Sequence, residues 1–276
     1  MNDQSDVTEL PLAPLSWPVR VLGRFVNASN SALLVELVDG DGVLVERDKE
    51  VELATLPWQR LAVYKPQKGE VPLWDFPPGT LHQREVAAYR VSEALGFDFV
   101  PETVLRDDLP YGPGSVQRFV PHDPWWQYFT VVAHHAERFS VALMKMVLFD
   151  LIVANADRKA GHVLVRDVRV APGGALDDPD VPLAASLALV DHGVCFHEEQ
   201  KLRTVAWDFA GAHVPEALHA VVSQAYDTFD DTLGDTLLGL LSPKEIEACR
   251  NRMGDVLTLQ TFPQPHDERA FPWPLV

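Results

Sequence analysis

The alternation of hydrophobic and polar residues predicts that the first part of the chain is rich in β-strands. Residues 19 to 26 (VRVLGRFV) and 31 to 38 (SALLVELV) favour strands, and the turn-forming sequence NASN lies between them. This pattern indicates a β-hairpin. Residues 43 to 46 (VLVE) predict a short strand, and residues 60 to 66 (RLAVYKP) predict another that stops at its proline.

The pattern changes to helical spacing over residues 79 to 97 (GTLHQREVAAYRVSEALGF). Thr80 is the candidate N-cap, with a glutamine three residues later, and Gly96 marks the exit of the predicted helix. Residues 100 to 108 and 114 to 122 predict two more strands, separated by the Gly- and Pro-rich sequence LPYGPG. The first part of the chain is therefore expected to form an antiparallel sheet that carries one helix.

Longer hydrophobic runs follow. Residues 140 to 156 (SVALMKMVLFDLIVANA) predict a buried helix, whereas residues 162 to 167 and 185 to 196 predict strands. Two helices are predicted near the end of the chain, over residues 215 to 231 and 242 to 260, and Ser242 is expected to cap the second.

These elements predict an α+β fold with two lobes. We expect a loose N-terminal tail over residues 1–15, an antiparallel β-sheet N-lobe with one helix over residues 16–120, and a mainly helical C-lobe over residues 121–276. The two lobes would join near residues 117 to 122.

Composition and charge narrow the choice of partners. The chain of 276 residues is 47% hydrophobic and 23% charged, as in ordinary globular proteins. Its net charge of −17 repels phosphate backbones and anionic lipids, so we expect neither a nucleic-acid partner nor stable membrane association. The sequence has no signal-peptide pattern and no membrane-length apolar run, which predicts a cytoplasmic protein.

Four residues occur along the chain in the order that a bilobal kinase requires. Lys65 ends a predicted strand, Glu85 lies on the following helix, Asp157 lies in the polar loop NADRKAGH, and Asp191 ends the strand before HG. Phosphoryl transfer uses a cation on the phosphates, a carboxylate that holds this cation, a base for the attacking hydroxyl and a metal ligand. Glu93 lies about two turns from Glu85, so only one of the two can face Lys65.

Arg158 and Lys159 lie beside Asp157 and would either balance the charge of a transferred phosphate or form a solvated pair. The first predicted hairpin has neither type of glycine-rich phosphate loop. Its turn still offers backbone N–H groups and the hydroxyl of Ser29 or Ser31, so Ser29, Asn30 and Ser31 are candidate phosphate-binding residues.

The motifs VYKP, REVAAY, NADRKAGH and VDHGVCFH resemble those of the phosphatidylinositol 3/4-kinase-like and HipA-like branch of the kinase superfamily, in particular an actinobacterial group within it. The resemblance spans about residues 20 to 210. It implies a bilobal protein-kinase-like fold and an atypical kinase that uses ATP with Mg²⁺ or Mn²⁺. In this family Lys65 would bind phosphate, Glu85 would hold Lys65, Asp157 would be catalytic and Asp191 would bind the metal.

The resemblance also places a hinge at residues 116 to 120 (VQRFV), where the backbone around Gln117 and Phe119 would bind adenine. One position departs from the family, because His162 stands five residues after Asp157 where the family has a metal-binding Asn. An imidazole suits Mn²⁺ or Zn²⁺ better than Mg²⁺. Either the metal preference has shifted, or one metal site is lost, or the chain is a pseudokinase that binds nucleotide without transferring phosphate.

The acceptor is expected to be the hydroxyl of a protein or a small molecule, because the acidic charge disfavours a membrane lipid. Residues 123 to 129 (DPWWQYF) would form either a lid or partner site, or a local core. Nucleotidyl transfer remains open. A metal-dependent hydrolase is the alternative enzyme, although its usual ligand spacings are absent. Its candidate ligands are His134, His135, His162, Asp191, His192 and His197.

Overall fold

The computed structural model describes residues 11–25, 30–40, 56–166 and 187–276. Residues 43 to 46, where a short strand was predicted, lie outside these ranges. The strands are β1 (Val19–Arg24), β2 (Leu33–Leu37), β3 (Leu61–Pro66), β4 (Thr103–Arg106), β5 (Gly114–Arg118), β6 (Val163–Val165) and β7 (Leu187–Leu189). The α-helices are α1 (Leu81–Ala94), α2 (Tyr128–Val153), α3 (Glu216–Asp227), α4 (Gly234–Leu237) and α5 (Pro243–Thr258).

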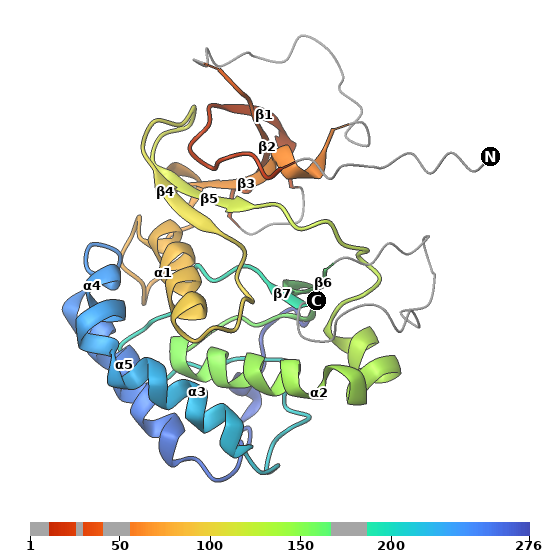
Figure 1. Cartoon of the computed structure of the whole chain (residues 1–276), viewed down its shortest axis with the longest axis vertical. Helices are drawn as coiled ribbons and strands as arrows, with labels where there is room; N and C mark the ends of the chain where they lie inside the picture. The colour runs from red at the N-terminus through yellow and green to blue at the C-terminus, as the bar shows by residue number, and fades with distance from the viewer. Residues whose placement is uncertain (1–10, 26–29, 41–55, 167–186) are drawn as a thin grey trace.

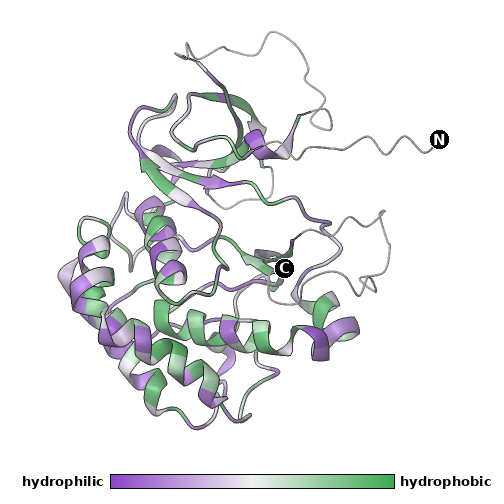
Figure 2. Ribbon diagram, viewed as in Figure 1, coloured by the Kyte–Doolittle hydropathy of each residue, from purple (hydrophilic) through white to green (hydrophobic). Residues whose placement is uncertain are grey.

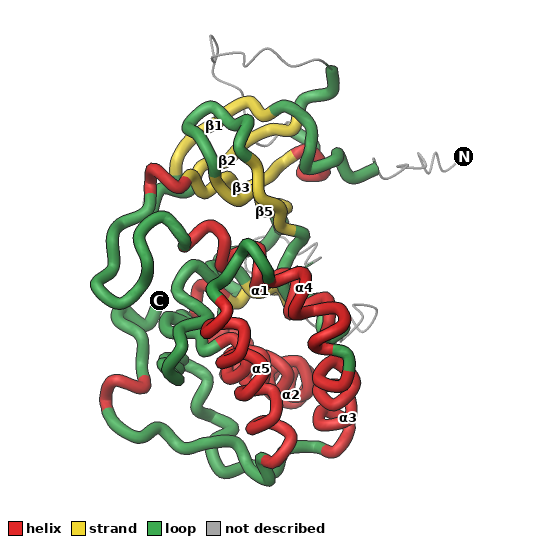
Figure 3. Tube along the Cα trace, turned by 90° about the vertical axis from the view of Figure 1, so that its left-hand side faces the viewer, coloured by secondary structure: helices red, strands yellow, loops and turns green. Residues whose placement is uncertain are grey.

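Five antiparallel strands form the main sheet, in the order β1-β2-β3-β5-β4. The sheet lies at one end of the molecule and α2 to α5 lie at the other, with α1 between them (Figures 1 and 3). Helix α1 is the connection from β3 to β4, and it packs on β4 and β5. The prediction of an α+β fold with an antiparallel sheet that carries one helix is confirmed.

The two faces of the main sheet differ. Paired residues point to the same face, so Leu33, Tyr64 and Val116 share one face, whereas their neighbours in the chain, Lys65 included, point to the other. Ala13 and Leu15 cover part of the first face and are buried there in a hydrophobic cluster. The expectation that the tail is loose as far as residue 15 is therefore wrong for these two residues, because their apolar side chains cover the sheet.

Helix α1 has the predicted position but not the predicted N-cap. Thr80 has helical backbone angles, and its hydroxyl donates to the carbonyl of Pro77 rather than accepting from the first turn. The carboxylate of Glu70 instead accepts from the backbone N–H of His82 at 2.8 Å. Gly96 ends the helix as predicted, with a φ of 59° that glycine adopts without strain.

Helix α2 is longer than predicted, because it begins at Tyr128 rather than near residue 140. It has a kink at His135. Its C-terminal half is mostly hydrophobic (Figure 2) and is buried among α1, α3 and α5. Within residues 123 to 129, Trp126 and Tyr128 are buried in the same core, whereas Trp125 is 60% exposed. Half of the aromatic side chains in this stretch therefore belong to a local core, because Phe129 is also exposed.

Helix α5 packs against α2 and α3. Ser242 caps α5 as predicted by accepting from the backbone N–H of Glu245. Helix α4 was not predicted. The predicted strands before and after residues 167 to 186 form the hairpin β6–β7. The C-terminal segment returns to this region (Figure 1), where the backbone N–H of Ala160 donates to the carbonyl of Leu275 at 2.8 Å.

Of the helices in the described ranges, none has the length and apolar character needed to cross a membrane.

Candidate functional site

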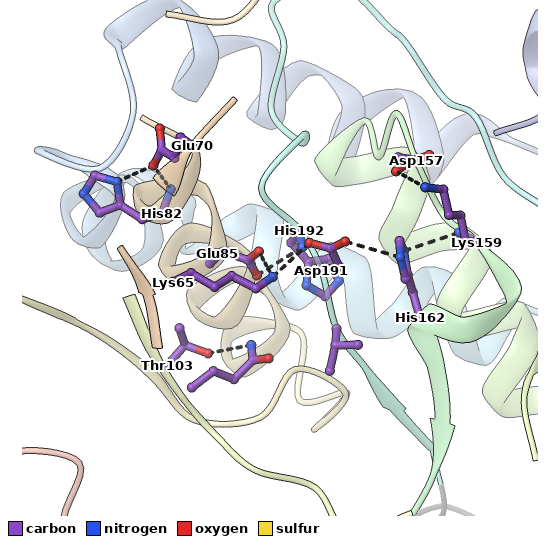
Figure 4. Close-up of polar contacts among 12 residues, drawn as sticks. Lys65, Glu70, His82, Glu85, Thr103, Asp157, Lys159, His162, Asp191 and His192 are labelled. Carbon is purple, nitrogen blue, oxygen red and sulfur yellow. Dashed lines mark hydrogen bonds and ion pairs between the residues drawn. The ribbon is translucent and has the colours of Figure 1, made fainter. Parts of the chain in front are cut away.

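Lys65 is the centre of a group of polar residues between the sheet and the helices (Figure 4). Its ammonium group forms ion pairs with Glu85 and with Oδ1 of Asp191, the latter at 2.8 Å. Glu93, the other candidate on α1, instead pairs with Arg90 on an exposed part of the helix. Of the two glutamates, the structure brings Glu85 to Lys65.

The chain after β7 holds Asp191 in this group. Asp191 has a φ of 63°, a left-handed conformation that costs free energy in any residue with a side chain. The next residue, His192, donates its backbone N–H to Oε2 of Glu85 at 3.1 Å. Glu85 thereby contacts both Lys65 and the backbone beside Asp191, so one carboxylate joins β3, α1 and the segment after β7.

The charges of Lys65 and Asp191 stabilise each other. Burial opposes the charge on Lys65, but the carboxylates of Asp191 and Glu85 outweigh burial and raise the pKa of the Lys65 ammonium group. The positive charge of Lys65 holds the pKa of Asp191 well below its usual range. Lys65 is therefore cationic and Asp191 anionic at neutral pH, which are the states needed to bind a phosphate and a metal ion.

Asp157 lies in the loop after α2, beside this group (Figure 4). Its backbone N–H donates to the side chain of Asn155 at 2.9 Å, and its carboxylate pairs with Lys159 at 3.2 Å. Burial raises the pKa of Asp157 to about 6, against the opposing effect of Lys159. A carboxylate with this pKa is a suitable acceptor for the proton of a hydroxyl group.

Arg158 points into the interior of the protein. Its side chain is fully buried and pairs with Asp150 of α2, and it also donates to Nε2 of His192 at 2.8 Å and to the carbonyl of Val190. Both suggested roles of Arg158, as a phosphate-facing cation and as a solvated one, are wrong. Its contacts instead fasten the Asp157 loop to the segment that carries Asp191.

His162 also belongs to this group. Its Nε2 lies 3.3 Å from Oδ2 of Asp191, and its Nδ1 accepts from the backbone N–H of Lys159. Burial lowers the pKa of His162 to about 4, so the ring is neutral at pH 7. Since Nδ1 accepts, the proton of the neutral ring lies on Nε2 and points at Asp191.

The residues present fit a divalent cation only in part. Asp191 offers a carboxylate, the type of ligand that Mg²⁺ and Mn²⁺ take, whereas His162 directs an N–H toward that carboxylate rather than a lone pair outward. In the described ranges, no group of three or more His, Cys, Asp or Glu residues could hold a metal ion. A cation at Asp191 would therefore need phosphate oxygens or water as its other ligands.

The residues predicted to contact the nucleotide are less clearly grouped. Ser29 lies outside the described residues, and the side chain of Asn30 accepts from the backbone N–H of Val71. Ser31 lies against Gly69 and lines a cavity of about 490 Å³ on the side of the sheet away from Lys65. The structure therefore does not bring Asn30 and Ser31 to Lys65.

At the predicted hinge, the side chain of Gln117 is buried and donates to the hydroxyl of Thr103 at 2.9 Å. Gln117 pairs with Val63 in the sheet, so its side chain is on the same face as Lys65. The backbone N–H of Phe119 donates to the carbonyl of Leu61 and is not free to contact adenine.

Several residues that build the site were not predicted from the sequence. They are buried polar residues that position the predicted ones: Arg84, Asp150, Asn155 and Glu245. His192 was predicted only as a possible ligand of a metal-dependent hydrolase, and not as a residue that positions the others. A signal was present, because Asp150 interrupts the apolar sequence VLFDLIV, and a buried carboxylate requires a partner. The partner, Arg158, follows eight residues later, but only the turn after α2 brings the two together.

Comparison with known proteins shows a relative that matches nearly the whole chain. Protein Rv2133c of Mycobacterium tuberculosis is 34% identical over 288 aligned residues, which cover 92% of this chain and 91% of that protein. Phosphatidylinositol 4-kinase gamma 8 of Arabidopsis thaliana is 32% identical over 139 aligned residues, 42% of this chain but 22% of the plant protein. No family model matches the chain.

Two solved structures show a similar arrangement. The Helicobacter pylori proinflammatory kinase CtkA has a TM-score of 0.47 at 11% identity, over 92% of this chain and 95% of that chain. The structure of hydra Fam20 with sugar has a TM-score of 0.44 at 14% identity, over 86% of this chain and 84% of that chain. The kinase-like character of the fold rests on the protein's own topology, in which a lysine on β3 meets a glutamate on the next helix.

Proposed function

The chain belongs to the family of Mycobacterium tuberculosis protein Rv2133c, and we propose that it is an atypical kinase that transfers the γ-phosphoryl group of ATP to a hydroxyl group. The observation that carries this proposal is the contact of Lys65 with both Glu85 and Asp191, next to the Asp157 loop. The partial match to a phosphatidylinositol 4-kinase supports the same class of reaction.

In the proposed reaction, the acceptor oxygen attacks the γ-phosphorus and the bond from this phosphorus to the β–γ bridging oxygen breaks, which releases ADP. The carboxylate of Asp157 takes the proton of the acceptor hydroxyl. Lys65 exchanges its ion pair with Asp191 for phosphate oxygens, while Glu85 keeps the ammonium group in place. Catalysis then consists mainly of positioning and of charge neutralisation.

Asp191 would hold Mg²⁺ or Mn²⁺, which would neutralise negative charge on the phosphates when bound. The acceptor is a protein or small-molecule hydroxyl, since a net charge of −17 opposes docking on anionic lipid. The proposed location remains the cytoplasm, on the evidence of the sequence.

One observation favours a second function, that of a pseudokinase. His162 occupies the position of the expected metal-binding Asn, and its Nε2 is directed at Asp191. If this contact persists when nucleotide binds, the chain would bind ATP and serve as a regulator without transferring phosphate. The hydrolase alternative has no comparable support, because Nε2 of His192 is already occupied by the guanidinium of Arg158.

The test measures ATP binding by calorimetry with Mg²⁺, with Mn²⁺ and without metal, and release of radioactive phosphate from γ-labelled ATP. We expect metal-dependent binding in the wild type and slow transfer to water or to the chain itself. Lys65→Ala should lose binding, Asp191→Ala should lose its metal dependence, and Asp157→Asn should bind ATP but lower transfer by about 10²–10⁴-fold.

The matched control for Lys65→Ala is Lys68→Ala, because Lys68 follows the same strand but lies outside the Lys65 group. Binding with no transfer under any condition would support the pseudokinase. Absence of ATP binding in the wild type would refute both proposals.

A further inference from the structure

Arg84 precedes Glu85 on α1 but points to a different side of the helix, since successive helical residues are about 100° apart. Its side chain is buried, with 1% exposure, and faces the helical part of the molecule. One guanidinium nitrogen donates to the carbonyl of Cys195 at 2.7 Å, and another pairs with Glu245 at the start of α5. The guanidinium also lies over the ring of Phe76, 4.8 Å from its centre.

Glu245 is itself held in place. Its carboxylate accepts from the backbone N–H of Ser242 at 2.8 Å, as part of the cap of α5. Burial disfavours its charge, but the hydrogen bonds from Arg84 and Ser242 outweigh burial and lower the pKa of Glu245. Arg84 therefore joins α1 to a rigid helix end that is far away in the sequence.

The segment after Asp191 is tied to α1 at two points. The backbone N–H of His192 contacts Glu85, and the carbonyl of Cys195 contacts Arg84. Between them, the segment passes so close to α1 that a Cβ at Gly193 would lie 3.4 Å from Cβ of Leu81. Adjacent residues of one helix thus clamp the two ends of this short segment.

A further ion pair strengthens this connection. Asp75, in the loop before α1, pairs with Lys201 at 2.8 Å, and both side chains are largely buried. The apolar side of α1 also belongs to the core of the helical part, where Ala87 and Val91 are inaccessible to solvent. Helix α1 is thus fixed to the helical part of the molecule as well as to the sheet.

We propose that Arg84 is a positioning residue that keeps α1 against the segment after Asp191, so that Glu85 holds Lys65 in place before any ligand binds. The pair of Lys65 and Glu85 would then be permanently assembled and would need neither phosphorylation nor an effector to form. This proposal rests on the proposed kinase function in one respect, namely that Lys65 binds nucleotide. The effect of Arg84 on the position of Lys65 can be tested without nucleotide.

The first measurement is the rate at which acetic anhydride acetylates Lys65, followed by mass spectrometry of peptides. An ammonium group held in two ion pairs reacts slowly, because it rarely presents a free amine. Arg84→Met removes the ties to Cys195 and Glu245 with little change in length, and we expect Lys65 to react about tenfold faster. In a Glu85→Gln background, where the link to Lys65 is already weakened, Arg84→Met should add less than about twofold.

Arg252→Met is the matched control. Arg252 is a similarly buried arginine on α5 that donates to the carbonyls of Ile152 and His197, and none of its hydrogen bonds reaches α1. We expect Arg252→Met to lower the melting temperature but to change the reactivity of Lys65 by less than about twofold. Equal reactivity of Lys65 in the Arg84 and Arg252 variants would overturn the proposal.

Glu245→Gln is measured in parallel, because it keeps the side-chain volume while removing the charge that faces Arg84. It should raise the reactivity of Lys65 about threefold, and it decides the question if Arg84→Met does not fold. ATP affinity, measured by calorimetry with Mn²⁺, should fall most in Arg84→Met, less in Glu245→Gln and least in Arg252→Met. A wild type that binds no ATP, but whose Lys65 responds to Arg84 as described, would refute the kinase function and leave the positioning role in place.

Discussion

At the scale of single residues, the site depends on carboxylates held in different environments. Asp191 lies next to Lys65 and stays ionised, whereas Asp157 is half-buried beside Lys159, and burial raises its pKa to about 6. Two nearby carboxylates with separated pKa values suit different roles, one as a metal ligand and the other as a proton acceptor.

The raised pKa of Asp157 predicts that both the transfer rate and the stability of the protein depend on pH. Because the ionised form of Asp157 accepts the proton, the transfer rate should rise with pH up to about 6 and then level off. The raised pKa also means that ionised Asp157 opposes folding above pH 6, since the unfolded chain releases this proton more easily. Asp157→Asn should therefore raise the melting temperature by about 2–4 °C near neutral pH and not below about pH 4.

Steady-state rates across pH and differential scanning calorimetry of both proteins test this prediction. Glu93→Gln is the control, because Glu93 is an exposed carboxylate away from Lys65. A melting temperature for Asp157→Asn that is lower than that of the wild type at neutral pH would contradict the assigned environment of Asp157.

At the scale of elements, the Asp157 loop is held from several directions. Arg158 fastens it to Asp150 of α2 and to the carbonyl of Val190, and the backbone of Arg158 also pairs with that of Arg203 and Val205. The C-terminal segment supplies a further contact, because the buried backbone N–H of Ala160 donates to the carbonyl of Leu275. These contacts hold in place a loop that has one short 3-10 helix, Ala160–His162.

Removal of residues 274–276 should expose the backbone N–H of Ala160, which then has no protein acceptor. We expect hydrogen exchange at Ala160 to accelerate about tenfold or more, and exchange in α5 to stay unchanged, because the opening is local. Removal of Val276 alone is the control, since it keeps the carbonyl of Leu275. Equal exchange in the two truncated chains would show that the contact does not protect the loop.

At the scale of the whole molecule, the net charge of −17 acts against the compact state through mutual repulsion. Salt screens this repulsion, so the melting temperature should rise by a few degrees between about 10 mM and about 150 mM NaCl at pH 7. Near the isoelectric point of about 4.9, the same change in salt should have little effect. A melting temperature that falls with salt at pH 7 would show that the specific ion pairs outweigh the overall repulsion.

Local patterns in the chain were enough to locate most elements and the central residues of the site. Alternation located the strands of the main sheet, helical spacing located α1, and the polar break after a buried run located Asp157. These features depend on residues that are close in the sequence, so their physical cause can be read from the sequence. The choice of Lys65 and Asp191 came from the kind of residue at each strand end, and the two prove to be neighbours.

The remaining features depend on contacts between distant segments, which no local pattern encodes. The choice of Glu85 over Glu93 follows from the face of α1 that meets β3, and the inward orientation of Arg158 follows from the position of Asp150. The prediction for Ser31 was not met for the same reason. A serine is suited to binding phosphate, but folding places Ser31 against Gly69 and not beside Lys65. Arg84 and Glu245 are 161 residues apart in the sequence and form a buried pair only after folding, because each charge needs the other once water is excluded.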